Sequence, residues 1–225
     1  MEFSFPATIT LETASLENVT LETIVSRIDE LFRMRLGKTE FECRNLYGWE
    51  VIESPNPIPE IFLFDESREL KFSTVRYCIP QVLLLKSREI PATLTLTFNS
   101  NVPKFDPSNP WTMELEFEGK RIKRNMTGIG FETDYRLLEK EHGAALPLKN
   151  CFGCMYSDYS PYGGDVIGTM LCFRVCKNEY LAVRDKHDLL DLGEKHFVNV
   201  EAVPEIYTCE EFAPRDSSKH IGYRG

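Results

Sequence analysis

The chain has 225 residues, of which 42% are hydrophobic, so it is long enough to bury a substantial core without disulfide bonds. Lys and Arg together number 26 and Asp and Glu number 35, which gives a formal net charge of −9. A surface of this sign repels phosphate backbones, so the composition argues against nucleic-acid binding.

The N-terminal part predicts a strand followed by a helix. Residues 5–13 alternate between apolar and polar side chains, as a half-buried strand does. Between Thr20 and Gly37 the apolar residues recur at helical spacing, and they are Leu21, Ile24, Val25, Ile28, Leu31 and Phe32. Thr20 can cap the start of such a helix and Gly37 can end it.

The middle of the chain predicts a succession of strands. We expect them at residues 40–44, 49–53, 60–64, 70–75, 81–86, 92–99, 112–118 and 129–132. Leu94, Leu96 and Phe98 alternate with threonines, so one face is buried and one is wet, which favours an antiparallel sheet. A basic run follows at residues 120–124, and we expect a solvated turn there because no base-stacking aromatic residues interleave with it.

The last third predicts short helices at residues 134–142 and 185–192, with strands at 167–175 and 198–209. The expected fold class is therefore α+β: a predominantly antiparallel β-sheet, one N-terminal amphipathic helix and a C-terminal cysteine-rich zinc-knuckle subdomain. We place the β-rich region at residues 1–146 and the cysteine-bearing subdomain at 147–225. The two can also form one continuous domain.

Five of the seven cysteines lie in the last third, beginning with the pair Cys151 and Cys154. A Cys-x-x-Cys pair lets two thiolates reach one ion from a tight turn, and tetrahedral zinc then needs two further ligands. If residues 167–175 form a strand that continues to Cys176, the α-carbons of Cys172 and Cys176 are roughly 13 Å apart, too far for one zinc ion. We therefore expect zinc at Cys151, Cys154, Cys172 and Cys209.

Other arrangements of these cysteines stay open. A sharp turn after Arg174 would favour Cys176 over Cys209, and His187 or His196 can replace a cysteine. All five thiols can also be merely buried, because cysteine is among the most buried residue types.

The C-terminal half, roughly residues 110–225, resembles an uncharacterised bacterial family, a domain of unknown function. The resemblance rests on CFGCMYSDYSPYG at 151–163, CFR at 172–174, YTCEEF at 207–212 and GYRG at 222–225. The matching positions include Cys151, Cys154, Cys172 and Cys209 but not Cys176. The resemblance implies a bacterial cytoplasmic protein and transfers no activity.

The loop after the cysteine pair is rich in tyrosine. Tyr156, Asp158, Tyr159 and Tyr162 can form a binding surface, because tyrosines give a large contact area at low entropic cost. The simpler alternative is that these rings pack over the cysteine turn and close the loop.

Three functional classes fit the sequence. We prefer a non-enzymatic protein-binding module with a structural zinc site, whose acidic face covers a basic partner, as an inhibitor or immunity protein covers a toxin. A cysteine-dependent enzyme would use Cys151 or Cys154 with His187 or His196 as base, and with Asp158 or Asp165 to orient it. A thiol redox protein would use Cys151 and Cys154, but glycines and a proline downstream disfavour the helix that such a motif opens.

We expect a cytoplasmic location and no membrane segment. The start of the chain lacks a basic segment followed by an apolar one, and the most apolar run, residues 79–85, is far shorter than a bilayer span. Reduced thiols in that compartment favour metal binding or burial over disulfides.

Overall fold

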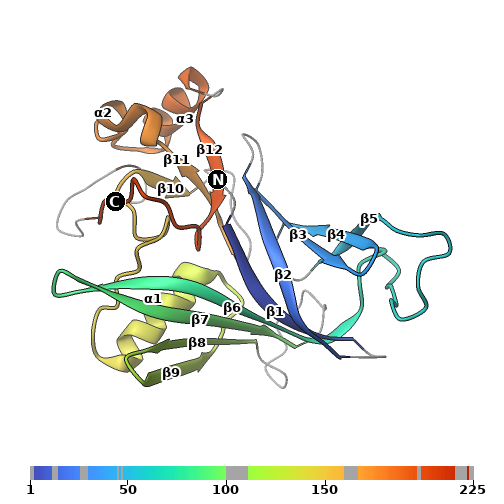
Figure 1. Ribbon diagram of the computed structural model, residues 1–225. Coiled ribbons are helices and arrows are strands. Elements are labelled where there is room, and N and C mark those ends of the chain that lie inside the picture. The colour runs from blue at the N-terminus through green and yellow to red at the C-terminus, as the bar shows by residue number, and fades with distance from the viewer. Residues whose placement is uncertain are drawn as a thin grey trace.

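The large sheet dominates the computed structural model, which describes residues 3–11, 15–25, 30–44, 46, 48–99, 111–159, 167–196, 199–215 and 222 (Figure 1). Its strands lie in the order β5-β4-β3-β2-β1-β6-β7-β8-β9, and neighbouring strands are antiparallel. Their bounds are β1 Phe3–Leu11, β2 Ser15–Val25, β3 Glu30–Leu36, β4 Thr39–Cys43, β5 Glu50–Glu53, β6 Phe72–Leu85, β7 Arg88–Phe98, β8 Thr112–Phe117 and β9 Lys120–Asn125.

The cysteine-rich end folds into a smaller layer above one end of the large sheet (Figure 1). Its strands β10 (Ser157–Tyr159), β11 (Thr169–Cys172) and β12 (Glu201–Pro204) pair antiparallel in that order. Short helices follow β11: the 3-10 helix η1 (Arg174–Cys176), α2 (Lys177–Tyr180) and α3 (Lys186–Lys195). Helix α1 (Phe131–His142) lies beside the β6–β9 part of the large sheet. The expectation of a predominantly antiparallel β protein with few helices is confirmed.

The expected N-terminal helix is wrong, because the structure has strands β2 and β3 there. The helical spacing coincides with a second pattern: in β3 the buried Phe32, Met34 and Leu36 alternate with arginines, which is the period of a strand. Gly37, with φ of 66°, does not end a helix but forms the tight turn between β3 and β4. Pairing with β1 and β4 on either side satisfies the backbone of both strands and overrides the helical propensity.

Strand β6 joins two strands that the sequence predicts separately, at residues 70–75 and 81–86, and it contains Pro80. Proline cannot donate a ladder hydrogen bond and belongs where a strand has a free edge. The pairing of β1 with β6 ends at Tyr77, so Pro80 lies beyond β1 and is exposed. Residues 147–149 then cover this side, since Lys149 donates to the Val82 carbonyl at 2.7 Å and Leu84 to the Pro147 carbonyl at 2.9 Å.

Further expectations for the middle of the chain are corrected. Residues 60–64 form a turn and an extended segment, and residues 131 and 132 begin α1. The basic run 120–124 lies in β9, an edge strand, and is not a turn. Arg121 pairs with Glu114 and Glu116, and Arg124 with Glu141 at 2.7 Å, so much of its charge is neutralised by neighbours.

The smaller layer shares its packing with the large sheet. Phe152, Ile167 and Ile206 belong to the same buried cluster as the sheet residues Tyr77 and Leu83. Two further clusters lie within the C-terminal part, one around Phe173 and Tyr180 and one around the cysteines. None of the described helices is long and apolar enough to cross a membrane.

At the large sheet's β5 edge lies an acidic arm, which we define as residues 50–69, that is, β5 and the segment that follows it (Figure 1). Burial raises the pKa of Glu69 above its ordinary value of 4.5, and the charges of Asp65 and Glu50 raise it further. The ionised carboxylate therefore destabilises the folded arm.

Glu69→Gln is expected to stabilise the protein at neutral pH. A carboxyl with a raised folded pKa contributes its stability below the unfolded pKa and loses it as the pH rises through the folded value. The gain from the neutral amide should therefore vanish below about pH 4.5. Urea unfolding at pH 7 and pH 4 measures it, with the exposed Glu66→Gln as control, and an equal gain at both pH values would contradict the electrostatic cause.

Candidate metal centre

The pair Cys151 and Cys154 spans a tight turn that is fixed on both sides. The Cys154 amide donates to the Cys151 carbonyl at 3.2 Å, and the Cys151 amide donates to the Tyr207 carbonyl at 2.8 Å. Between them, Gly153 is so close to Leu148 that an added Cβ would lie 2.1 Å from the Leu148 carbonyl oxygen. The turn therefore requires glycine at this position.

A buried polar chain ties the turn to the large sheet. Asn150 donates from Nδ2 to Gln81 Oε1 at 2.8 Å, and Gln81 donates from Nε2 to the Ile206 carbonyl at 2.9 Å. Both side chains are buried, with at most 3% of their surface exposed. The cysteine turn, strand β6 and the segment after β12 are thereby held together.

The four cysteines expected as ligands lie close together, because Cys151 and Cys172 share a buried cluster, Cys209 packs against it, and the tight turn joins Cys154 to Cys151. Burial raises the pKa of the Cys151 thiol most strongly, and the other three thiols raise it further. Burial likewise raises the pKa of Cys172 to about 11, with Cys154 and Cys209 among the contributing charges. The pKa of Cys209 is raised by burial and also by Cys154. Residues far apart in sequence thus form one thiol cluster, which we define as Cys151, Cys154, Cys172 and Cys209.

Backbone amides point at two of these sulfurs. The amide of Arg174 hydrogen-bonds to Cys172 and lowers its pKa, and the amide of Glu211 does the same at Cys209. In both cases the donor lies two residues after the cysteine. Amide donors to sulfur favour the thiolate form, which is the form that binds a metal.

A cation also flanks the thiol cluster. Arg174 forms an ion pair with Glu201 on β12. Burial alone would lower the pKa of the Arg174 guanidinium, but Cys172, Glu201 and further neighbours raise it overall. The nearby positive charge lowers the pKa of Cys151 and Cys172 and so opposes part of the effect of burial.

The thiol cluster is not a ready-made ligand set. Within the described part of the chain, no group of three or more Cys, His, Asp or Glu side chains is arranged so that it could hold a metal ion. Each of the four cysteines is a free thiol. Protonated thiols pack as small apolar groups and do not attract one another. Their sulfurs would converge only when a metal ion binds and displaces the thiol protons.

The alternative ligands lie elsewhere. Cys176 follows Arg174 in η1 and packs with Phe173 and Tyr180, and its pKa responds to burial, Glu179 and Lys195 rather than to the other thiols. His187 has 85% of its side chain exposed, and His196 lies 3.2 Å from Glu179. The sharp turn after Arg174 therefore does occur, but it carries Cys176 away from the thiol cluster.

The tyrosine loop is partly described, and Tyr162 and Asp165 lie outside the described residues. Tyr156 is half-buried, with the Lys177 ammonium 5.1 Å from its ring centre. Asp158 is fully buried and accepts a hydrogen bond from the Tyr180 hydroxyl at 3.1 Å. The Asp158 side chain therefore stabilises the interior and is not part of an exposed binding surface.

The sequence did not predict that residues after Cys209 pack against the cysteine turn and Tyr180. Arg215 donates to the Ser157 carbonyl at 2.6 Å, to the Tyr180 hydroxyl at 3.0 Å and to the Cys154 carbonyl at 3.4 Å. Gly222, with φ of 70°, lies so close to Tyr180 that an added Cβ would be 2.1 Å from the hydroxyl oxygen. The GYRG motif was the only signal for this close approach. The other residues of this motif lie outside the described part of the chain.

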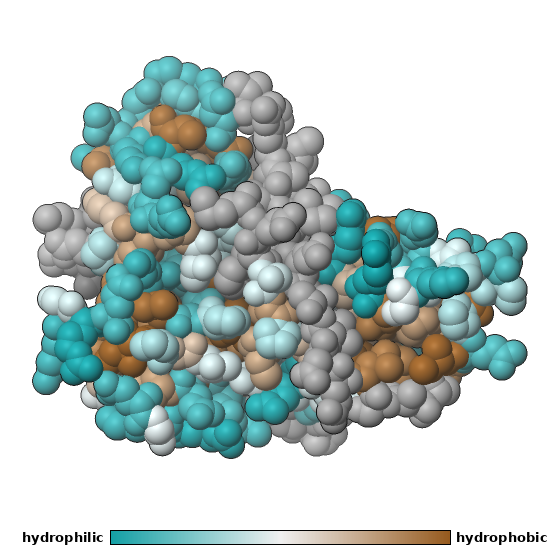
Figure 2. Space-filling view, in the orientation of Figure 1, coloured by the Kyte–Doolittle hydropathy of each residue, from teal (hydrophilic) through white to brown (hydrophobic). Residues whose placement is uncertain are grey.

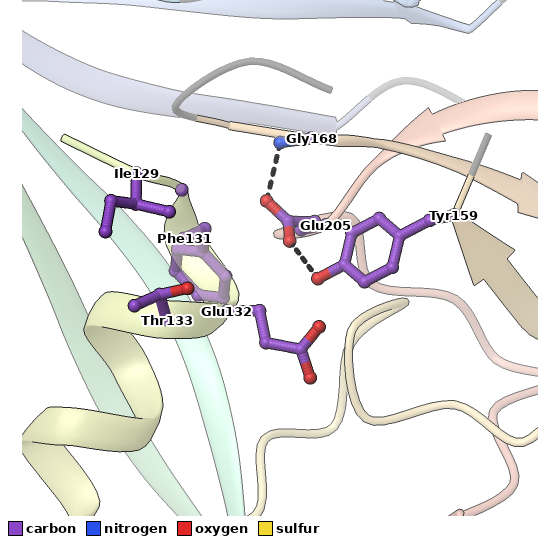
Figure 3. Close-up of a pocket in the computed structure, with 8 residues that line it drawn as sticks. Ile129, Phe131, Glu132, Thr133, Tyr159, Gly168 and Glu205 are labelled. Atoms are coloured by element: carbon purple, nitrogen blue, oxygen red, sulfur yellow. Dashed lines mark hydrogen bonds between the residues drawn. The ribbon is translucent and has the colours of Figure 1, made fainter. Parts of the chain in front are cut away.

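A cavity of about 180 Å³ lies between α1 and the smaller layer (Figure 3). The lining residues are Ile129, Gly130, Phe131, Glu132, Thr133, Tyr159, Gly168 and Glu205. Glu205 accepts hydrogen bonds from the Gly168 amide at 2.6 Å and from the Tyr159 hydroxyl. Both carboxylate oxygens are thus engaged in joining β10 to the segment after β12, so we assign this glutamate a structural part.

Comparisons with protein families, curated proteins and solved structures found no match to this chain.

Proposed function

We propose that this chain is a non-enzymatic protein-binding module whose C-terminal layer is held together by a structural zinc ion at Cys151, Cys154, Cys172 and Cys209. The observation that carries the proposal is the packing of the four residues: Cys151 and Cys172 lie in one buried cluster, Cys209 packs against it, and the tight turn holds Cys154 beside Cys151. These residues come from the cysteine turn, from the end of β11 and from the segment after β12. One ion would therefore link three separate pieces of the layer.

The donor set suits zinc. Four thiolates close a tetrahedral sphere and leave no position for water, which is the mark of a structural site rather than a catalytic one. The amides of Arg174 and Glu211 supply the hydrogen bonds to sulfur that support metal-bound thiolates. Binding requires the cysteine side chains to converge and to release their thiol protons.

The surroundings of the thiols do not favour the catalytic and redox alternatives. A nucleophilic or redox-active cysteine needs a lowered pKa, whereas burial raises the pKa of Cys151, Cys172 and Cys209. The Cys-x-x-Cys turn leads into strand β10, and not into the helix that a thioredoxin-like motif opens. Asp158 accepts hydrogen bonds from the Tyr180 hydroxyl and the Tyr159 amide, so both of its carboxylate oxygens take part in the packing of the smaller layer.

The charge of the chain supports a protein partner of opposite sign. A net charge of −9 favours association with a basic surface, because complementary potentials steer encounter and exclude wrong partners. An inhibitor or immunity protein that covers a basic toxin fits this description.

Elemental analysis of the purified protein tests the metal site directly. We expect about one zinc ion per chain after gel filtration. Removal of the ion with a chelator should lower the temperature of unfolding, and addition of zinc should restore it. A protein that is folded and metal-free, and whose unfolding does not respond to zinc, would refute the site.

A further inference from the structure

The acidic arm brings together charge and exposed apolar surface. It contains Arg68 as its single basic residue against six acidic ones, which are Glu50, Glu53, Glu60, Asp65, Glu66 and Glu69. Among the described residues, the structure records no ion pair to any of these six. The nearby Glu40 and Glu42 of β4 differ, because Arg35 and Arg33 neutralise them.

Apolar side chains are exposed on the same arm. Of the large hydrophobic residues that the structure shows as exposed, Ile52, Ile58 and Leu63 belong to it, with 46%, 44% and 38% of their surface accessible. The remaining two, Ile129 and Val175, stand on separate elements. Figure 2 shows hydrophobic and hydrophilic residues adjoining one another where the arm projects at the right of the view.

Several contacts anchor the arm to the sheet and to itself. Phe62 is buried, and its ring contacts Phe41 of β4 edge-on at 5.2 Å between centres. Glu50 pairs with Glu69 in an isolated bridge, and Lys71 donates to the Leu63 carbonyl at 2.8 Å. A surface fixed in this way loses little entropy when it binds.

Local geometry turns the apolar groups outward. The register between β4 and β5 shifts so that Glu40 faces Glu53 while Phe41 faces Val51, which leaves Ile52 as the extra residue of a bulge. Bulges at sheet edges redirect side chains and end strand pairing. Pro57 and Pro59 flank Ile58 and, like Pro55, have no amide to donate, so a partner cannot pair with this stretch as a continuous strand.

We propose that the acidic arm is a docking surface for a basic protein segment that carries an apolar anchor. Lysine or arginine side chains of the partner would pair with the unneutralised carboxylates, and the anchor would cover Ile52, Ile58 and Leu63. The charge decides between occupants: a second copy of this chain would bring two sets of carboxylates together, and a membrane or nucleic acid would present negative groups to them. This inference rests on the proposed function as a binding module.

Peptide display on the intact chain tests the docking surface. Random twelve-residue peptides are selected against the full protein, and the selected sequences are synthesised and titrated by fluorescence anisotropy. We expect them to combine Lys or Arg with aromatic or large aliphatic residues. Ile58→Ser and Glu53→Lys should each weaken binding by about tenfold or more, and added salt should weaken it too.

Matched variants elsewhere serve as controls. Ile129→Ser removes an apolar side chain that is even more exposed than Ile58, and Glu194→Lys reverses an exposed charge on α3, so both should leave binding within about twofold of the original. If Ile58→Ser and Glu53→Lys leave the affinity for the peptides unchanged, the acidic arm is not the docking surface, although the chain can still be a binding module. The complete absence of binding peptides would overturn both, while the zinc content tests the metal site separately.

Two further results would also overturn the arm as proposed. One is a concentration-dependent dimer in sedimentation that Ile58→Ser abolishes. The other is binding to phosphatidylglycerol vesicles that the same variant abolishes.

Discussion

Cys209→Ser is expected to release the zinc ion and to lower the free energy of unfolding by about 4 kcal/mol or more, because a structural metal contributes its binding energy to folding. Cys209 is the most informative of the four positions. It is only half-buried, whereas Cys151, Cys154 and Cys172 are buried, so the exchange of sulfur for oxygen costs little packing there. Metal content and urea unfolding of the purified variant measure the two effects.

The control for this variant is Cys176→Ser. Cys176 is buried with Phe173 and Tyr180 and lies outside the thiol cluster, so its replacement should cost about 1–2 kcal/mol and leave the zinc in place. A chelator should then destabilise the original protein and Cys176→Ser but leave Cys209→Ser unchanged. Equal loss of metal from both variants would show that the ligand set is wrong.

Two independent lines predict that the four cysteines lie close together. One is the spacing of the cysteines along an expected strand, and the other is the resemblance to a known set of sequence motifs. Spacing along an assumed strand 167–175 disfavoured Cys176, but the strand ends at Cys172 and the chain turns at once into η1. The assumed strand was therefore wrong, although Cys176 does pack in a different buried cluster from Cys151, Cys172 and Cys209. Matching positions in the resembling motifs pointed to the same four residues without any assumption about the backbone.

The error near the N-terminus has a physical cause. The apolar residues between 21 and 32 fit one helix as well as two consecutive strands, and local propensity alone cannot decide between the two structures. The alternation of Phe32, Met34 and Leu36 with Arg33 and Arg35 was the decisive signal, and it lay at the very end of the supposed helix. Pairing partners distant in sequence, which no local pattern contains, then fix the strands.

Contacts of the C-terminal tail were hard to predict for a related reason. The tail after Pro214 is polar and reads as a loose end, yet Arg215 bonds to three acceptors around the cysteine turn and β10. The sequence alone does not distinguish an arginine that donates hydrogen bonds to buried carbonyls from one that is exposed to solvent. The glycine at 222 was the better clue, because close approach of a backbone to Tyr180 tolerates no side chain.

Gly153→Ala, which adds a single methyl group to the cysteine turn, is expected to lower the free energy of unfolding strongly. The new Cβ would stand 2.1 Å from the Leu148 carbonyl oxygen, which is backbone and cannot swing away. The turn would have to move, and with it the amides of Cys151 and Cys154 and the buried pair Asn150 and Gln81. Overpacking of this kind costs about 3 kcal/mol or more, and here it should also weaken zinc binding because it displaces two of the proposed ligands.

The matched control is Gly193→Ala in α3, where an added Cβ has nothing within 4 Å. Alanine favours a helix over glycine by about 0.5–1 kcal/mol, so this variant should be slightly more stable than the original protein and keep its metal. Thermal unfolding with and without chelator separates the two consequences of Gly153→Ala. A loss of stability that persists in full after the metal is removed assigns the effect to packing alone. A loss that shrinks when the chelator is present shows that the turn acts through the zinc site.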